Sequence, residues 1–484
     1  MTAGPSGSAG PSGAAGLALL VDRLRELRED LWDPAAGLDR VPPGAALGID
    51  VAALGLHIVR ESAYGALADL EDGRTDRAVV ALRRVLALQL DAPGRPWDGT
   101  FPVTAEQPAP PAEGAVEWLH WDPNWRQFVG TALALVVARH AASLPADLVD
   151  DLMTAVRRCV AGEPDDRIPP WYTNPDLLHA WLLGWVGARD GSAPLLAAGE
   201  ARATAAADRV RRHGDVDEYS SPTYDGVDLL AAGLWAAHPP SPAYAGLAAV
   251  VLGAVGPRVA TLFHAELGAM AGPYIRAYGL GLDRYVALVA PWLVAAGAPV
   301  DRVLPWPLDA GTDHVHDLWF TPVVALLAPA VTPWLELRTA LPRRHVQRFG
   351  SVSAVSVLGV DVALGAETGR RPEFAATQHV PVTVHHATGW LGAACGDGCA
   401  GLDAVVVDDR TISAVVVPAT GGPSVSVRTL WSAEPVDLQV GAITLTCSPE
   451  PSSIEVKEDH PGWWAVLTWP VVGSDPPILT VEVT

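Results

Sequence analysis

The stretch EYSSPTYDGVDLLAAGLWAA, residues 218–237, passes from a loop of polar and aromatic side chains into Leu, Ala, Val and Trp at helical spacing. Three more stretches share this design: HWDPNWRQFVGTALALVVARH (120–140), WYTNPDLLHAWLLGWV (171–186) and AGPYIRAYGLGLDRYVALVAPWL (271–293). Their matching positions, fifty residues apart, hold Asn124, Asn174, Tyr224 and Tyr274. A period near fifty is typical of a repeated helical hairpin. The sequence therefore predicts a helical repeat with its polar loops in one phase.

A weaker phase extends the repeat backward to Arg74 and forward to Pro322, which makes about six hairpins. Six hairpins can close into a ring, an (α/α)6-type toroid. Loops in the same phase then meet at one end of the ring. We therefore expect the matched residues to line a single cleft.

The composition changes near residue 342. Up to that point the chain is rich in Ala and Leu with helical periodicity, whereas later runs such as SVSAVSVLGVDVAL (351–364) alternate between apolar and polar residues and are separated by Gly, Pro and Asp turns. The sequence predicts a disordered tail over 1–16, the toroid over 17–342 and an antiparallel β-sandwich over 343–484.

The net charge of -22 argues against nucleic-acid and anionic-membrane partners, because a basic face is needed to attract phosphate. The single lysine, Lys457, lies in the predicted sandwich, which excludes a lysine-based P-loop or Schiff base in the ring. Cys395 and Cys399 are expected to be a pair of loop thiols. The first residues lack the basic and apolar regions of a secretory signal, so we predict a cytoplasmic protein. We also expect that the protein uses no cofactor.

Two stretches carry the strongest candidates for catalysis. In EYSSPTYDG, a proline-containing turn lies between Tyr219 and Tyr224 and could aim a hydroxyl into the cleft, although both rings could equally pack beneath the loop. In AGPYIRAYGLGLDRY, Arg276 could bind a carboxylate, with Tyr274 and Tyr278 on the same helix face. The alternative for Arg276 is an ion pair with Asp283 or Asp225.

Asparagine beside tryptophan is typical of sugar sites, in which the amide binds hydroxyls and the ring stacks on the sugar. The stretch HWDPNWRQF holds His120, Asn124 and Trp125 close together, and WYTNPDLLH adds Trp171, Tyr172 and Asn174, so these are candidate substrate contacts. Each asparagine could instead cap its helix. His314, in GTDHVHDLWF, is a candidate base or substrate contact, and no metal site is predicted because the spacing matches no metal motif.

A helical ring followed by an antiparallel sandwich, with Asn, His, Tyr and Arg in the ring loops, resembles polysaccharide lyases of the toroid-plus-sandwich type. These include the heparinase II/III-like, alginate and hyaluronate lyase groups. The pair Asn124 and Trp125 is similar to the Asn-Trp element of the hyaluronate and chondroitin lyases, but Arg126 and Gln127 stand where another aromatic residue is usual.

The resemblance implies β-elimination: a base removes the proton α to a uronate carboxyl, and an acid protonates the leaving oxygen at C4. It implies Asn174 or Asn124 with Arg276 as neutraliser and Tyr224 or Tyr219 as acid and perhaps base. His120, His179, His264 and His314 all remain open as the base. The acidic chain favours a short uronate-containing oligosaccharide or a small natural product over a long polyanion.

Three other functions are open. A glycoside hydrolase needs two carboxyls across the bond, and the candidates are Asp122, Asp217, Glu218, Asp225 and Asp283. An isomerase, dehydratase or cyclase could act on a less polar molecule in a ring lined with Trp and Tyr. A non-catalytic carbohydrate-binding protein would need only aromatic stacking.

Overall fold

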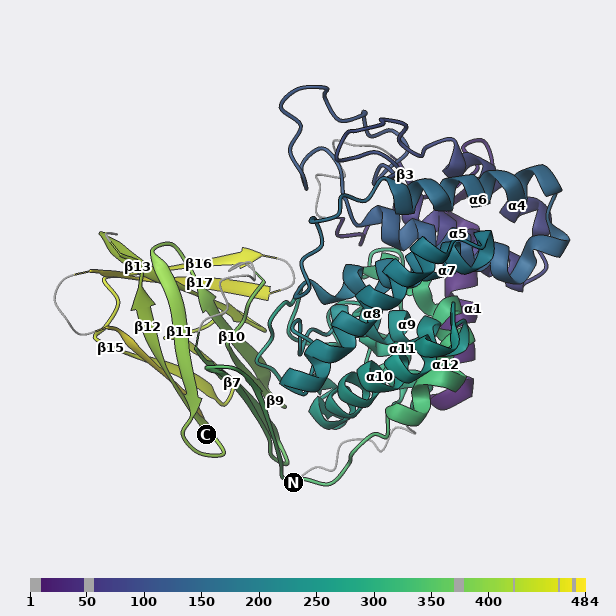
Figure 1. Ribbon diagram of the computed structural model, residues 1–484. Helices are drawn as coiled ribbons and strands as arrows, with labels where there is room; N and C mark the ends of the chain where they lie inside the picture. Colours follow the sequence, from purple (N-terminus) through teal and green to yellow (C-terminus); the bar gives the residue numbers. More distant parts are fainter. Residues whose placement is uncertain (1–9, 48–55, 370–377, 421–422, 460–461, 472–475) are drawn as a thin grey trace.

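The computed structural model describes residues 10–47, 56–369, 378–420, 423–459, 462–471 and 476–484. Helices make up most of the N-terminal half, and antiparallel sheets make up the C-terminal half (Figure 1). The last helical turn ends at Trp334, and the first strand of the large sheet begins at Arg343.

Five helices form the inside of the helical half. They are α3 (Val59–Glu71), α5 (Trp125–His140), α7 (Thr173–Asp190), α9 (Tyr224–Ala237) and α12 (Thr321–Val331). In α5 every residue from Trp125 to Val137 is buried, and in α9 every residue from Asp225 to Trp235 is buried. Helices that are apolar on all faces need neighbours on every side, which explains their central position.

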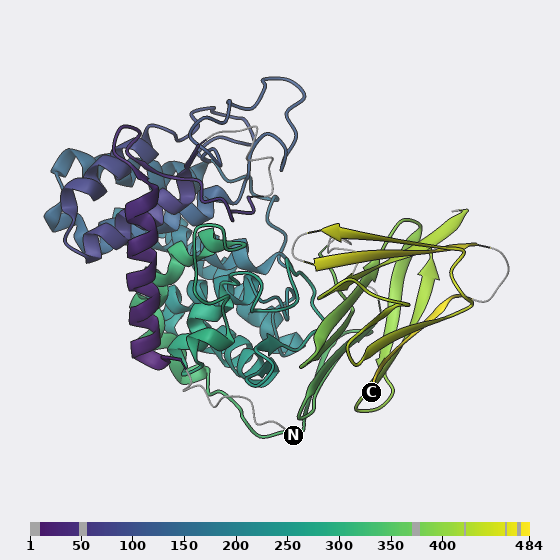
Figure 2. The ribbon, with the colours of Figure 1, turned by 180° about the vertical axis from the view of Figure 1, so that it is seen from behind.

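A second set of helices covers the first. It comprises α4 (Thr75–Leu86), α6 (Ala146–Ala161), α8 (Ala193–His213), α10 (Pro242–Leu262) and α1 (Gly13–Leu31). The short α11 (Val289–Ala295) is buried from Val289 to Val294 and packs against α1, α9 and α12. In α1 the buried residues Leu17, Leu20, Leu24 and Leu27 follow helical spacing, so one stripe faces inward and the rest faces solvent. Figure 2 shows α1 running along the outside of the helical half.

The inner helices contact one another in the order α3, α5, α7, α9 and α12, and α12 also contacts α3. The ring therefore closes within the described part of the chain, but with five inner helices where six hairpins were predicted. Arg74 is also misassigned, because it precedes the outer helix α4. The long segment 87–124 between α4 and α5 breaks the fifty-residue period at that point.

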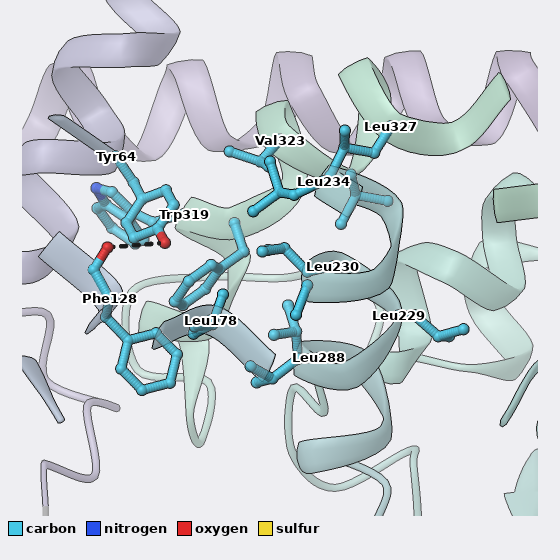
Figure 3. Packing of buried hydrophobic residues seen from close by; sticks show 14 of the residues in the cluster. Tyr64, Phe128, Leu178, Leu229, Leu230, Leu234, Leu288, Trp319, Val323 and Leu327 are labelled. Carbon is cyan, nitrogen blue, oxygen red and sulfur yellow. Dashed lines mark hydrogen bonds between the residues drawn. The ribbon is translucent and has the colours of Figure 1, made fainter. Parts of the chain in front are cut away.

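The ring is filled by large apolar side chains from most of its helices. Figure 3 shows Leu230 and Leu234 of α9 close to Val323 and Leu327 of α12. One buried polar group here is paired, because the Tyr64 hydroxyl donates to the Phe128 carbonyl oxygen at 3.1 Å. Interlocking packing of this kind holds the helix starts in fixed positions.

Two helical segments, Pro242–Leu262 and Val315–Trp334, are long and apolar enough to cross a membrane by length and composition alone. The first is 56% buried and the second 67% buried within the protein. Their packing in the ring accounts for their apolar character.

The C-terminal half contains two antiparallel sheets. The larger has the order β16-β17-β13-β10-β9-β8-β7-β6, and the smaller has the order β11-β12-β18-β15-β14. Their bounds are β6 (Arg343–Phe349), β7 (Val352–Leu358), β8 (Val362–Thr368), β9 (Val382–His386), β10 (Gly389–Cys395), β11 (Cys399–Val406), β12 (Thr411–Pro418), β13 (Ser424–Trp431), β14 (Gln439–Val440), β15 (Ile443–Ser448), β16 (Ser453–Asp459), β17 (Gly462–Pro470) and β18 (Ile478–Val483). Both sheets contribute to one apolar core, which packs them face to face.

The large sheet also packs against the helices (Figures 1 and 2). Leu358, Ala363, Trp390 and Leu430, from four of its strands, belong to the apolar cluster of the helical half. Strand β8 is buried from Val362 to Glu367, on both faces, because helices cover one side and the small sheet covers the other. The two halves therefore share a buried interface.

Short strand pairs complete the helical half: β1 (Trp32–Asp33), β2 (Leu38–Arg40) and β3 (His57–Ile58) form one sheet, and β4 (Phe263–His264) pairs with β5 (Ala269–Met270). Two predictions need correction. The disordered tail was expected over 1–16; residues 1–9 lie outside the described part of the chain, but residues 13–16 belong to α1, in which Gly16 and Leu17 are buried. Cys395 and Cys399 were expected to be thiols, but they form a disulfide across the turn between β10 and β11.

Candidate active site

A cavity of about 520 Å³ lies where the inner helices begin. Side chains from the first turns of α3, α5, α7 and α9 reach it, as do residues before α12 and one residue of the sheet half. Its lining consists of Ala46, Leu47, Arg60, Trp118, Asp122, Asn124, Trp125, Phe128, Trp171, Tyr172, Asn174, Glu218, Thr223, Tyr224, Val227, Arg276, Tyr278, Leu288, His314, His316, Asp317, Phe320 and Gln378. The predicted convergence of loops at one cleft is therefore present for Asn124, Asn174 and Tyr224.

Arg276 lies at the centre of a hydrogen-bond network in this cavity. Its Nη1 donates to Glu218 Oε1 at 2.6 Å, and its Nη2 donates to the Tyr224 hydroxyl at 2.8 Å. The guanidinium carbon also lies 3.9 Å from the centre of the Tyr224 ring and 5.4 Å from that of Tyr172. The ion pair predicted as an alternative forms, but with Glu218 rather than with Asp283 or Asp225.

Glu218 joins Arg276 to Asn174. The Asn174 side-chain Nδ2 donates to Glu218 Oε2 at 2.8 Å, and the Asn174 backbone nitrogen donates to the same oxygen at 3.2 Å. Glu218 is fully buried, so this carboxylate depends on these donors for its charge to be stable. The predicted neutralisers Asn174 and Arg276 are thus held by one carboxylate.

Tyr224 is the first residue of α9, and its hydroxyl is hydrogen-bonded to that of Tyr278. Burial raises the pKa of the Tyr224 phenol well above its usual value of 10.0, and the nearby Arg276 cation opposes this shift. The phenol is therefore protonated at neutral pH. Tyr278 is 37% exposed, which leaves the hydroxyl pair open to the cavity.

His314 and His316 form the wall next to Tyr278. The ring of His314 lies 5.0 Å from that of Tyr278 and 5.7 Å from that of His316, between centroids. His314 has φ of +56°, a backbone conformation that is strained for a side chain of this size and that recurs at functional sites. Burial lowers the pKa of His316 well below 6.5, so this ring is neutral.

Asn124 and Tyr172 lie beside this network. Asn124 Nδ2 donates to the Tyr172 hydroxyl at 2.6 Å, and Asn124 Oδ1 accepts from Arg167 Nη1 at 2.9 Å. Asn124 is the residue before α5, but its side chain makes no cap hydrogen bond. Burial raises the pKa of Tyr172 above its usual value.

Three tryptophans add broad apolar surface to the cavity. Trp125 and Trp171 lie in the lining, and the ring of Trp171 stacks 6.1 Å from Tyr172. Trp118 is 48% exposed and has φ of +65° in the segment that leads to α5. Aromatic faces next to amides and hydroxyls suit a ligand with both apolar and polar faces, such as a sugar ring.

The other side of the cavity carries Arg60, Asp122 and Asp317. Arg60 donates from Nε to Glu61 Oε1 at 2.7 Å, and its guanidinium carbon lies 5.3 Å from the centre of the Trp125 ring. Burial raises the pKa of Asp122 to about 6, and burial also raises the pKa of Asp317. No group of three His, Cys, Asp or Glu side chains among the described residues is placed to hold a metal ion.

Three predicted site residues lie outside the cavity. Tyr219 is buried against Phe349 and donates its hydroxyl to Glu367 of the sheet half. Tyr274 is also fully buried, and its hydroxyl donates to the Met270 carbonyl oxygen, because this stretch pairs with the sheet half and starts no helix. His120 bonds locally, accepting from the Val116 backbone nitrogen at 2.9 Å.

Among the histidines left open as the base, only His314 lines the cavity. His179 is buried beside Gln127, and burial lowers its pKa to about 3. His264 bonds the Gly359 carbonyl oxygen at 2.9 Å. Among the carboxyls, Asp122 and Glu218 line the cavity, whereas Asp217 pairs with Arg209, Asp225 pairs with Arg258 and Asp283 points to solvent near Arg284.

Sequence reasoning missed Arg60 and Gln378. Arg60 lies in the first turn of α3 and lines the cavity. The fifty-residue period does not predict this position, because the long segment after α4 interrupts the period. Gln378 comes from the sheet half and carries no sequence pattern. Only the folded interface brings Gln378 to the ring.

No curated protein matches this chain. A solved structure of the Streptomyces coelicolor A3 chondroitin AC lyase in complex with chondroitin sulphate is similar to it. That comparison covers 100% of this chain and 80% of the lyase chain, with 15% sequence identity and a TM-score of 0.41. The family model described as "Domain of unknown function (DUF8769)" matches residues 31–329, more than half of the chain. The protein therefore belongs to the DUF8769 family.

Proposed function

We propose that the cavity catalyses β-elimination on a short, uronate-containing oligosaccharide. The observation that carries the proposal is the network of Tyr224, Arg276 and Asn174. A protonated tyrosine lies 2.8 Å from an arginine, and one buried carboxylate joins that arginine to an asparagine. Elimination needs an acid and a group that stabilises the charge developing on the uronate carboxyl, and this network supplies both.

Tyr224 is the proposed acid. The base removes the proton from C5 of the uronate, the electron pair of that bond forms the C4–C5 double bond, and the C4–oxygen bond breaks. Tyr224 then gives its proton to the leaving oxygen, and Arg276 stabilises the phenolate that remains. The raised pKa of the Tyr224 phenol favours this role, because it keeps the proton in place until the bond breaks.

His314 is the proposed base. It lines the cavity beside Tyr278, with the two ring centres 5.0 Å apart. The starts of α5, α7 and α9 face the same space, and the positive ends of their dipoles favour a bound carboxylate. Arg276 and Asn174 are the proposed partners of that carboxylate.

The substrate is expected to be short. The whole chain carries a net charge of -22, which repels a long polyanion, whereas the cavity offers local cations and aromatic faces for one or a few sugar rings. A helical ring followed by an antiparallel sandwich is the architecture that this proposal would share with such lyases.

The test is ultraviolet absorbance during incubation with short oligosaccharides of different uronates, because elimination creates a conjugated double bond. We expect an absorbance rise with at least one uronate, abolished in Tyr224→Phe and retained in Tyr274→Phe. An absorbance rise that persists at the wild-type rate in Tyr224→Phe would exclude Tyr224 as the acid. No rise with any uronate would remove the lyase proposal.

A glycoside hydrolase is the second candidate, and one observation favours it. Asp122 and Asp317 line the same cavity, and the raised pKa of Asp122, about 6, suits a general acid. Hydrolysis would produce new reducing ends without any ultraviolet signal. Loss of that activity in Asp122→Asn, with retention in Tyr224→Phe, would favour the hydrolase.

A further inference from the structure

A short segment of the sheet half lies directly against the segment that carries Arg276. Val380 and Tyr274 exchange both backbone hydrogen bonds, at 2.8 and 3.0 Å. The Ala277 nitrogen donates to the Gln378 carbonyl oxygen at 2.9 Å. These bonds fix the backbone of residues 378–380 relative to that of residues 274–277, as in a two-stranded ladder.

The side chain of Gln378 completes the coordination of Arg276. Gln378 Oε1 accepts from Arg276 Nε at 2.7 Å, on the edge of the guanidinium that neither Glu218 nor Tyr224 uses. All three guanidinium nitrogens therefore have a partner. A planar guanidinium held at three points has its orientation set.

The partner at Nε is neutral. The charged and titratable groups that face Arg276 and Tyr224 are Glu218, Tyr172 and Tyr278, with His314 behind Tyr278. Glu218 is the one carboxylate that bonds Arg276 among the described residues. Because Glu218 already balances the charge of Arg276, a glutamate at position 378 would place a second, uncompensated negative charge at hydrogen-bond distance and make the cavity repel an anionic ligand.

The residue after Gln378 strengthens the same interface. His379 Nε2 lies 3.1 Å from Glu367 Oε1, and the other oxygen of Glu367 accepts from the Tyr219 hydroxyl. Tyr219 follows Glu218 in the chain. Gln378 and Glu367, both of the sheet half, thus bond Arg276 and the neighbour of Glu218 in the helical half.

We propose that Gln378 is a positioning residue, which orients Arg276 from the sheet half without adding a second negative charge beside the Arg276–Glu218 pair. The sheet half is then a structural part of the site. The turnover measurement below rests on the proposed function, whereas the other two measurements do not.

The first measurement is direct and needs no ligand. The nitrogen-15 NMR signal of the Arg276 Nε–H group, assigned by its loss in Arg276→Lys, should exchange slowly with solvent in the wild type. We expect much faster exchange in Gln378→Ala and no change in Gln439→Glu, a control at the exposed residue of strand β14. Equal exchange in the wild type and in Gln378→Ala would overturn the proposal.

The second measurement uses glucuronate and glucose as probes, which differ in the carboxylate. Binding is followed by tryptophan fluorescence, because Trp118, Trp125 and Trp171 line the cavity. Gln378→Glu should weaken glucuronate binding at least about fivefold, the effect of one added like charge about 4 Å from the ligand carboxylate in water. Glucose affinity should stay the same, as should both affinities in Gln439→Glu. Equal losses for both sugars in Gln378→Glu would indicate a merely structural residue and contradict the proposal.

The third measurement is turnover of a uronate oligosaccharide. Gln378→Glu should lower kcat and raise KM, whereas Gln378→Ala should mainly lower kcat because Arg276 loses its orientation. If no uronate is turned over but the NMR and probe results hold, the proposed reaction fails and the role of Gln378 stands. If turnover is normal in both variants, the role of Gln378 fails and the reaction stands.

Discussion

Replacing Glu218 by glutamine tests the organisation of the site most sharply through stability. Glu218 is fully buried and receives hydrogen bonds from Arg276 Nη1 at 2.6 Å, from Asn174 Nδ2 at 2.8 Å and from the Asn174 backbone at 3.2 Å. Glu218→Gln removes the charge that balances Arg276, whose side chain is only 14% exposed. It also places the glutamine amide group, which donates hydrogen bonds, beside the Asn174 and Arg276 groups that already donate.

Breaking a buried ion pair by removing one partner costs about 3–5 kcal/mol. Glutamine keeps one acceptor oxygen, so we expect the lower end, about 3 kcal/mol of unfolding free energy. The assay is urea unfolding followed by circular dichroism. The matched control is Asp283→Asn, because Asp283 and Arg284 form a pair whose side chains are 63% and 51% exposed. Such a pair contributes less than about 1 kcal/mol. A loss in Glu218→Gln no larger than in Asp283→Asn would refute the buried network.

Three further predictions concern packing, pH and a corrected residue. Gly226→Ala would place a Cβ atom 2.4 Å from the Leu288 carbonyl carbon, so it should destabilise the protein by about 1–3 kcal/mol in urea unfolding. Gly246→Ala, with open space around the new carbon, should instead stabilise it by about 0.5–1 kcal/mol. Burial raises the pKa of Asp122 to about 6, so the folded state binds this proton more tightly than the unfolded chain does. The stabilising contribution is present below about pH 4 and is lost as pH rises through 6. Asp122→Asn should therefore exceed the wild type in stability above pH 6 and match it below about pH 4. Tyr274→Phe should cost about 1 kcal/mol through its lost hydroxyl bond and leave turnover intact.

Each of these predictions has an outcome that contradicts it. A neutral Gly226→Ala would mean that α9 and α11 are less closely packed than the structure shows. A constant stability difference between Asp122→Asn and the wild type from pH 4 to pH 8 would show that Asp122 has no raised pKa. Loss of turnover without loss of stability in Tyr274→Phe would return Tyr274 to the site.

The sequence predicted those parts of the site that local pattern determines. Asn124, Asn174 and Tyr224 each lie at the start of an inner helix. These positions were predictable because consecutive residues in the sequence change from a polar loop to an apolar helix. The strand half was predictable for a similar reason, since alternation in runs such as β7 directly reports which side chains are buried.

The parts that were wrong or missed depend on contacts between distant segments. Tyr274 fits the fifty-residue phase, but its backbone pairs with Val380, more than a hundred residues away, and this pairing replaces a helix start. Gln378 reaches the cavity only through the same interface. Tyr219 and Tyr224 look equivalent in sequence, but the docked sheet buries Tyr219 against Phe349 and leaves Tyr224 at the cavity.

Mass spectrometry of the products from a short uronate oligosaccharide is the most direct test of the proposed reaction. Elimination gives an unsaturated fragment that is lighter by one water than the corresponding hydrolysis product. We expect this fragment from the wild type and none from Tyr224→Phe or from Arg276→Met. Products that carry the added water, formed equally by the wild type and Tyr224→Phe, would contradict elimination by Tyr224 and Arg276.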